Sequence, residues 1–215
     1  MDLKKYYDDE FWSKNNLDNS KIQDKKWFRE RFDLFDKFVI PQLKPNMKVL
    51  EMGCCWGYLT NYLHKKTNLN VEGSDISTSG IREAKRIFNK LTFFKHDIEG
   101  GPTKKKYDAI ILFGILEHLF DYDCALKNIY QSLNSGGKIF IQIPCITWIR
   151  NRINFLFGDI EGELTRKPHI RFYSPKRITK LLEENNFNVQ KIIGFGKFSF
   201  CPSLCGTLLI IAHKK

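Results

Sequence analysis

Carboxylates close or follow three short apolar runs in the first half of this 215-residue chain. Glu51 lies in VLEMGCCWG, Asp75 ends NVEGSD and Asp97 ends LTFFKHD. If the runs are parallel strands, their carboxyl ends share the sheet edge at which α/β proteins bind ligands. Such acids can hold the hydroxyls of a ribose and, beside Ile98, the amino group of an adenine. Asp75 and Asp97 could each be a helix cap or turn former, but the three acids together predict a nucleoside site.

The turn after the first run contains Gly53 and Gly57, which lack a Cβ and let the backbone approach a ligand closely. A dinucleotide would need the full glycine fingerprint around its pyrophosphate, but Cys55 replaces the middle glycine and Trp56 crowds the turn. Glu51 would also repel a phosphate. The turn therefore favours a phosphate-free nucleoside with a cationic or amine-bearing group.

The cysteines do not form a pattern typical of metal or redox sites. They are scattered without paired CxxC units at zinc spacing, and the neighbours Cys54 and Cys55 resist mutual bridging. We expect free thiols in a reducing compartment. The six residues are Cys54, Cys55, Cys124, Cys145, Cys201 and Cys205.

The elements that must position these residues alternate along the chain. Patterns typical of strands cover 48–53, 70–75, 91–97, 107–114, 138–144, 188–195 and 207–214, and helical patterns cover 25–40, 58–66, 78–90, 124–133 and 174–187. This alternation predicts an α/β fold, with a doubly wound, mainly parallel, Rossmann-like sheet of seven strands. No helix fits between the last two strands, so the last strand should be antiparallel.

The motifs VLEMGCCWG, GSD, KHDI, YDAIILFGILEHL and LNSGGKIFIQIP resemble those of class I S-adenosylmethionine-dependent methyltransferases, in particular the broad group acting on small molecules and glycans. The resemblance covers roughly residues 45–215 and implies S-adenosyl-L-methionine as cofactor, with S-adenosylhomocysteine as product. It also implies a seven-stranded sheet with an antiparallel last strand. Cys55 departs from the family pattern, which usually has glycine there. We expect a helical cap over residues 1–44, a methyltransferase domain over 45–215 and an acceptor-binding insertion at 145–173.

The resemblance assigns nine residues to the cofactor. They are Glu51, Gly53 and Gly57 at the methionine end, Asp75 at the ribose, Ile76, Asp97 and Ile98 at the adenine, and Phe113 and Gly114 over the sulfonium.

Two histidines are candidates for the acceptor's base, because the displacement needs an aligned, deprotonated acceptor. We predict that His169 in KPHIRFY is the base and that His118 in ILEHL braces the floor of the site, although each could be purely structural. The insertion mixes aromatic and basic residues, which suits a modest-sized acceptor carrying a carboxylate or phosphate, and we expect the methyl group to go to an oxygen or a nitrogen of it. The predicted acceptor-binding residues are Trp148, Arg150, Arg152, Arg171 and Tyr173.

The sequence lacks motifs that several methyltransferase subclasses need for their chemistry. The turn after 107–113 has no N/D-P-P-Y motif to hold a planar nitrogen. Small-RNA end methyltransferases bind a metal around E-x-x-E-H, but Gly114 stands where the first Glu should be, so we expect no metal. Cys145 is roughly placed for carbon-5 pyrimidine chemistry, but the prolyl-cysteine partner is absent.

The formal net charge of +11 would suit a polyanionic partner, although biased composition also explains it. An RNA acceptor is therefore the alternative to a small molecule, and a non-catalytic, methyltransferase-like binding module is the second alternative. The sequence shows neither a signal core nor an apolar run long enough to span a membrane, so we expect a cytoplasmic enzyme.

Overall fold

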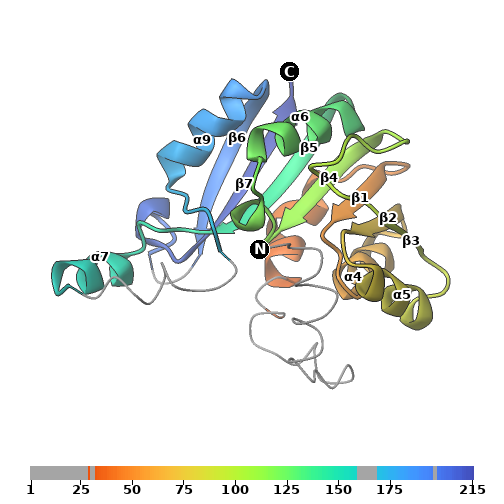
Figure 1. Cartoon of the computed structure of the whole chain (residues 1–215), viewed down its shortest axis with the longest axis horizontal. Coiled ribbons are helices and arrows are strands. Elements are labelled where there is room, and N and C mark those ends of the chain that lie inside the picture. Colours follow the sequence, from red (N-terminus) through yellow and green to blue (C-terminus); the bar gives the residue numbers. More distant parts are fainter. Residues whose placement is uncertain (1–28, 30–31, 159–168, 196–197) are drawn as a thin grey trace. The chain divides into compact units, whose positions relative to one another are not determined.

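The computed structural model describes residues 29, 32–158, 169–195 and 198–215 (Figure 1). It contains a seven-stranded sheet with the strand order β3-β2-β1-β4-β5-β7-β6. The chain forms two compact units, one ending at Asp97 and the other running Ile98–Lys215.

The first unit alternates strands and helices. Its strands are β1 (Lys48–Met52), β2 (Asn70–Asp75) and β3 (Thr92–Lys95), and its helices are α4 (Tyr58–Thr67) and α5 (Thr78–Ile87). Both strand pairs, β1 with β2 and β2 with β3, are parallel. Before β1 lie a π-helix, η3 (Phe35–Val39), and a 3₁₀-helix, η4 (Ile40–Gln42). Phe35 and Val39 are buried, as the amphipathic pattern over 25–40 predicts for its described part.

Phe93 organises the core of this unit next to the predicted cofactor loop. The ring is buried with Cys54, Ile81 and Ala84. A Cβ on Gly57 would lie only 2.5 Å from ring atoms of Phe93. Gly57 is therefore required by packing as well as by its backbone angle.

The second unit contains the remaining strands. They are β4 (Tyr107–Phe113), β5 (Leu133–Pro144), β6 (Phe187–Phe195) and β7 (Thr207–Lys214), with helices α6 (Tyr122–Ser132), α7 (Ile149–Leu156) and α9 (Pro175–Glu184) and 3₁₀-helices η5 (Leu116–His118) and η6 (Pro202–Leu204). β4 and β5 are parallel, whereas β7 is antiparallel to both β5 and β6. The predicted fold class and its antiparallel last strand are confirmed.

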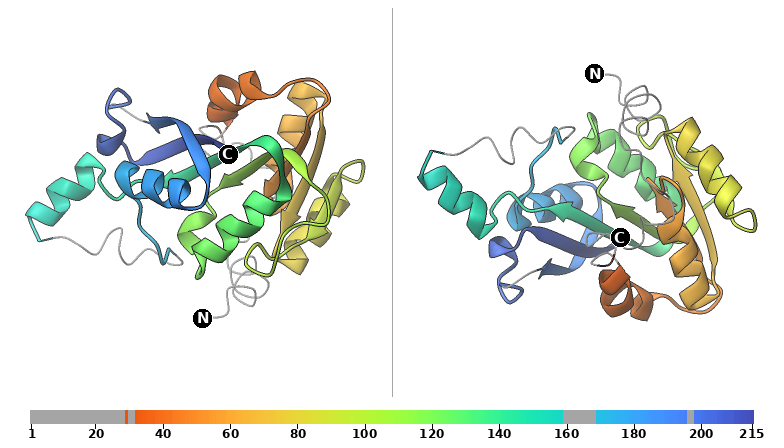
Figure 2. Two further views of the ribbon diagram at one scale, coloured as in Figure 1. Left: turned by 90° about the horizontal axis from the view of Figure 1, so that it is seen from above. Right: turned by 90° about the horizontal axis from the view of Figure 1, so that it is seen from below.

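Two elements of the second unit differ from the sequence prediction. β5 begins at Leu133 rather than 138, because Leu133 pairs with Tyr107 across a register shift. The segment after β5 contains the helix α7, which was not predicted from the sequence. Only Asn151 of that helix is buried, so it has no apolar stripe facing a core. Figure 2 shows α7 extending away from strands β5–β7 of its own unit.

The domain boundaries stay predictions. Most of the expected cap at 1–44 and part of the insertion at 145–173 lie outside the described residues. Among the helices that are described, none is both long and apolar enough to cross a bilayer.

Candidate active site

The turn after β1 directs its amides into the protein. The N–H groups of Gly53 and Cys54 both donate to the carbonyl of Ser74, at 2.7 and 2.9 Å, and Gly57 N–H donates to the Cys54 carbonyl at 2.8 Å. Gly53 and Gly57 have φ of +82° and +76°, which glycine adopts without strain. A pyrophosphate cradle needs amides aimed at the ligand. This turn uses them internally, which agrees with the predicted phosphate-free nucleoside.

Asp75 holds the turn after β1 in place. Its Oδ2 accepts from the Cys55 N–H at 2.8 Å, and its Oδ1 accepts from the Ser77 N–H at 2.8 Å. Cys55 has φ of +52°, a left-handed conformation that favours glycine. Each carboxylate oxygen keeps further lone-pair capacity after one bond, so holding the turn is compatible with accepting ribose hydroxyls. The cap of α5 is Ser77, which accepts from the Gly80 N–H at 2.9 Å.

Glu51 is buried on β1, and the hydroxyl of Thr60 on α4 donates to its carboxylate. Burial raises the pKa of the neighbouring Cys54 thiol well above its ordinary value, and the negative charges of Asp75 and Glu51 raise it further. The thiol therefore stays protonated at neutral pH and is a poor nucleophile. Asp97, at the end of this unit, is exposed.

Three of the predicted cofactor residues belong to the second unit: Ile98 is its first residue, and Phe113 and Gly114 lie at the end of β4. Ile98 is buried, and its carbonyl accepts from the side-chain amide of Asn128 at 2.8 Å. Phe113 is the buried last residue of β4. Gly114 follows it with φ of +71°, and its N–H donates to the carbonyl of Gln142 on β5 at 2.9 Å. The strand end is thus fixed by a turn that glycine adopts easily.

Residues 169–173 join the loops that follow β4 and β5. The N–H groups of Ile170 and Arg171 donate to the Glu117 carbonyl at 2.9 and 3.1 Å. On the other side, the Ile146 N–H donates to the Tyr173 carbonyl at 2.9 Å, in a parallel bridge. These backbone bonds set the distance between His169 and the loop after β4.

The result is a cluster of Glu117, His118 and His169, called here the glutamate–histidine cluster. The two imidazole rings lie 5.0 Å apart between centroids, at an interplanar angle of 62°. One oxygen or nitrogen atom of each side chain lies within 4.8 Å of those of the other two. Glu117 is only 3% exposed. The cluster can move a proton or hold a cation, and Glu117 is a member that the sequence prediction missed.

Two predicted acceptor-binding residues hold the loop after β4. Tyr173 is buried, and its hydroxyl donates to the Leu116 carbonyl at 3.2 Å; burial, followed by the charge of Glu117, raises its pKa well above the usual range. The Arg171 guanidinium donates to the Leu119 and Phe120 carbonyls at 3.4 and 2.5 Å. These contacts are structural, and a role in acceptor binding stays a prediction for both residues.

The other three predicted acceptor-binding residues lie at the start of α7. Trp148 packs against Gly206, where a Cβ would lie 3.2 Å from the indole. The exposed Arg150 guanidinium lies 5.7 Å from the Trp148 ring centroid, and Arg152, also exposed, donates from Nε to the Thr147 carbonyl at 2.8 Å. The helix region also exposes apolar side chains, namely Ile153, Phe155, Leu156 and Phe157.

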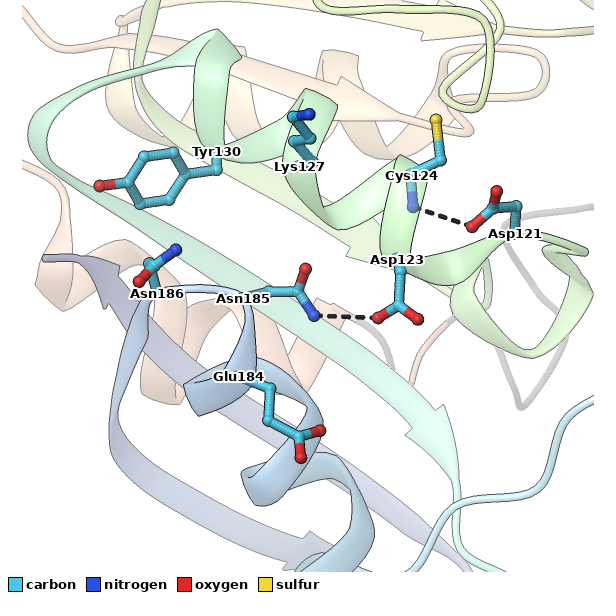
Figure 3. Close-up of a pocket in the computed structure, with 8 residues that line it drawn as sticks. All are labelled: Asp121, Asp123, Cys124, Lys127, Tyr130, Glu184, Asn185 and Asn186. Atoms are coloured by element: carbon cyan, nitrogen blue, oxygen red, sulfur yellow. Dashed lines mark hydrogen bonds between the residues drawn. The ribbon is translucent and has the colours of Figure 1, made fainter.

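A shallow hollow of about 500 Å³ lies between α6 and the end of α9 (Figure 3). Asp123 within it accepts from the Asn185 side-chain amide at 3.1 Å. The hollow contains no residue of the predicted cofactor or acceptor sites. Its lining residues are Asp121, Asp123, Cys124, Lys127, Tyr130, Glu184, Asn185 and Asn186.

Residues 22–192 match the family model described as "Methyltransferase domain". The chain belongs to this family of S-adenosylmethionine-dependent methyltransferases. The fold agrees: magnesium protoporphyrin IX methyltransferase from Synechocystis PCC 6803, solved with bound SAH, is similar with a TM-score of 0.65 and 17% identity, over 87% of this chain and 83% of that one. The PH0226 protein from Pyrococcus horikoshii OT3 has a TM-score of 0.73 and 17% identity, over 95% of this chain and 100% of that one.

Curated relatives of this methyltransferase differ in what their names say they methylate. The human mitochondrial ubiquinone biosynthesis O-methyltransferase is 27% identical over 162 residues, covering 69% of this chain and 43% of the relative. The tRNA U34 carboxymethyltransferase from Campylobacter hominis is 28% identical over 141 residues, covering 54% of this chain and 47% of the relative. The match thus spans less than half the length of either relative.

Proposed function

We propose that this methyltransferase transfers a methyl group to a hydroxyl oxygen of a small acceptor. The observation that carries the proposal is the glutamate–histidine cluster after β4. A hydroxyl must lose its proton as the methyl group arrives, and an imidazole with an ordinary pKa of about 6.5 can accept it near neutral pH. In keeping with this, the human relative is named as an O-methyltransferase.

The cofactor supplies a methyl group on a positively charged sulfur. On the protein side, the buried carboxylate of Glu51 favours a cationic or amine-bearing ligand, and Asp75 offers acceptors for ribose hydroxyls beside the turn that it holds. The internally bonded amides of that turn offer no cradle for a phosphate. This set of residues fits S-adenosylmethionine better than a dinucleotide.

The acceptor is proposed to combine an anionic or polar head with an apolar part. Arg150 and Arg152 are exposed on α7, and so are Leu156 at the end of the helix and Phe157 just after it. A cationic and apolar surface of this kind suits a sugar, a nucleotide sugar, a lipid-linked intermediate or an acidic metabolite. The arginines would bind the charge and the apolar side chains would cover the remainder.

RNA is the second candidate acceptor, favoured by the net charge of +11 and by the relative named as a tRNA carboxymethyltransferase. Binding through phosphate contacts weakens steeply with salt, because each contact releases counterions. We expect weak RNA binding that is lost near physiological salt. Tight, sequence-selective binding at that salt would favour the RNA acceptor instead.

The test is to incubate the protein with S-adenosylmethionine labelled in its methyl group and a cell extract separated into small molecules and RNA. We expect label in the small-molecule fraction, resistant to ribonuclease and reduced in the Asp75→Ala control. Label confined to RNA would overturn the acceptor class. Calorimetry should also show micromolar binding of S-adenosylhomocysteine, or about −8 kcal/mol. Binding without any methyl transfer would indicate the non-catalytic module.

A further inference from the structure

We infer that Cys145, Cys201 and Cys205 form a disulfide-exchange site, at which a small disulfide of the oxidised-glutathione class links Cys145 to Cys205. The three thiols come from two places in the chain. Cys145 follows β5, whereas Cys201 and Cys205 flank η6 in the connection between β6 and β7. All three are free thiols in this structure. The site lies wholly in the second unit and does not require methyl transfer.

Main-chain bonds bring Cys145 beside Cys205. The Cys145 N–H donates to the carbonyl of Gly206, the residue after Cys205, at 3.0 Å. The Pro202 carbonyl accepts from the Cys205 N–H at 3.2 Å and from the Cys145 thiol at 3.9 Å, so both groups contact the same oxygen. A disulfide needs Cα atoms about 4.4–6.8 Å apart, a separation that residues one step from an antiparallel cross-strand pair satisfy.

The Cys205 thiol is held next to Cys201 as well. It donates to the Phe198 carbonyl at 3.1 Å and to the Cys201 carbonyl at 3.6 Å. Gly194 on β6 leaves room for this thiol, because a Cβ there would lie 2.5 Å from the Cys205 sulfur. Burial raises the pKa of the Cys205 thiol, and the charges that Cys145 and Cys201 would carry raise it further. These charge effects agree with three neighbouring thiols.

Exposure sets the order in which the thiols react. Cys145 and Cys205 are each 2% exposed, whereas Cys201 is only half-buried. Exchange depends on access of the incoming disulfide to the attacking thiolate. A small disulfide therefore reaches Cys201 first, and the two buried thiols react from inside the protein.

The exchange proceeds in three balanced steps. The Cys201 thiolate attacks oxidised glutathione, whose sulfur–sulfur bond breaks to release one glutathione thiol. Cys205 then attacks the Cys201 sulfur and releases the second glutathione. Cys145 finally attacks the Cys205 sulfur, which returns Cys201 to a free thiol. In total, two protein thiols are oxidised to one disulfide, and one oxidised glutathione is reduced to two thiols.

The disulfide would restrain the start of the predicted acceptor-binding insertion. The Cys145 carbonyl accepts from the Trp148 N–H at 3.2 Å, and Cys145 forms a parallel bridge with Tyr173. The Trp148 indole packs against Gly206, where a Cβ would lie 3.2 Å from it. A link from Cys145 to Cys205 would thus fix the point at which these segments meet. Because it joins residues far apart in the chain, it should also raise Tm.

The test treats the reduced full chain with oxidised glutathione and maps its disulfides by mass spectrometry of unreduced peptides. We expect a Cys145–Cys205 link in the wild type, with a higher Tm that dithiothreitol reverses. Cys201→Ser should slow this link at least about tenfold, because it removes the accessible thiol. Cys145→Ser should stop at a Cys201–Cys205 link, and Cys205→Ser at glutathione on Cys201. Cys124→Ser, which removes another half-buried thiol in the same unit, should behave like the wild type.

The exchange site would be overturned if Cys145 and Cys205 stay free in a folded wild type, or if their link forms only in urea. A link that forms equally fast in Cys201→Ser would overturn the entry role of Cys201. Circular dichroism verifies that each variant is folded. Loss of S-adenosylhomocysteine binding by the reduced wild type would instead count against the methyltransferase proposal, so the two inferences fail separately.

Discussion

Replacing Asp75 with alanine tests the part of the cofactor site that the first unit builds. The substitution removes both carboxylate oxygens, which accept 2.8 Å hydrogen bonds from the Cys55 and Ser77 amides. It also removes the group predicted to hold the ribose hydroxyls. We therefore expect two separable effects, one on stability and one on cofactor affinity.

The size of the stability effect follows from the two bonds. Hydrogen bonds to a charged group contribute about 1.5–3 kcal/mol each, so removing both should cost roughly 3–6 kcal/mol. Cys55 would also lose the contact that holds it at φ +52°. For a chain of this length, each kcal/mol shifts Tm by about 2–4 °C, so Asp75→Ala should lower Tm by about 10 °C. Asp75→Asn keeps one acceptor oxygen and should show about half of this loss.

Affinity is measured by titrating S-adenosylhomocysteine at a temperature at which every variant is folded. Loss of the ribose contacts should weaken binding at least tenfold, or about 1.4 kcal/mol. Asp36→Ala is the matched control in the same unit, because Asp36 makes an exposed ion pair with Lys66 at 3.1 Å. That pair should contribute less than about 1 kcal/mol and leave the cofactor unaffected. If Asp75→Ala behaves like Asp36→Ala in both assays, the role assigned to Asp75 is wrong.

Three further predictions follow from single positions. Gly57→Ala should lower the free energy of unfolding in urea by at least about 2 kcal/mol, because the added Cβ would lie 2.5 Å from the Phe93 ring. Gly136→Ala is the control: Gly136 also has a positive φ, +67°, but nothing lies within 4 Å of its added Cβ, so this substitution should cost less. Equal losses for the two variants would contradict the packing argument. Burial raises the pKa of the Cys54 thiol, so unfolding releases a proton above the ordinary thiol pKa of about 8.5 and stability falls as pH rises beyond it. In denaturant titrations at several pH values, Cys54→Ala should lose less stability at alkaline pH than the wild type does. An unchanged dependence of the free energy of unfolding on pH would contradict this prediction. His169→Ala should lower turnover by about a hundredfold with cofactor affinity nearly unchanged; loss of cofactor binding would contradict its place in the acceptor site.

Local patterns in the sequence predicted most of the elements in the fold. The predicted strand at 70–75 has its observed bounds, because a short apolar run and the turn residues that end it lie within a few positions of one another in the chain. The positions of Asp75 and Asp97 relative to their strands follow from the same local patterns. The antiparallel pairing of the last two strands followed from a connection too short to hold a helix. Each of these inferences depends on residues that are close in the chain.

Other features depend on contacts between distant parts of the chain. The left-handed conformation of Cys55 depends on a bond from Asp75, twenty residues later. His169 reaches Glu117 and His118 only because main-chain bonds join the segment after it to the loop after β4. The residues themselves were visible in the sequence, but their assembly into one cluster was decided by tertiary structure, because hydrogen bonds between distant segments leave no periodic pattern in either.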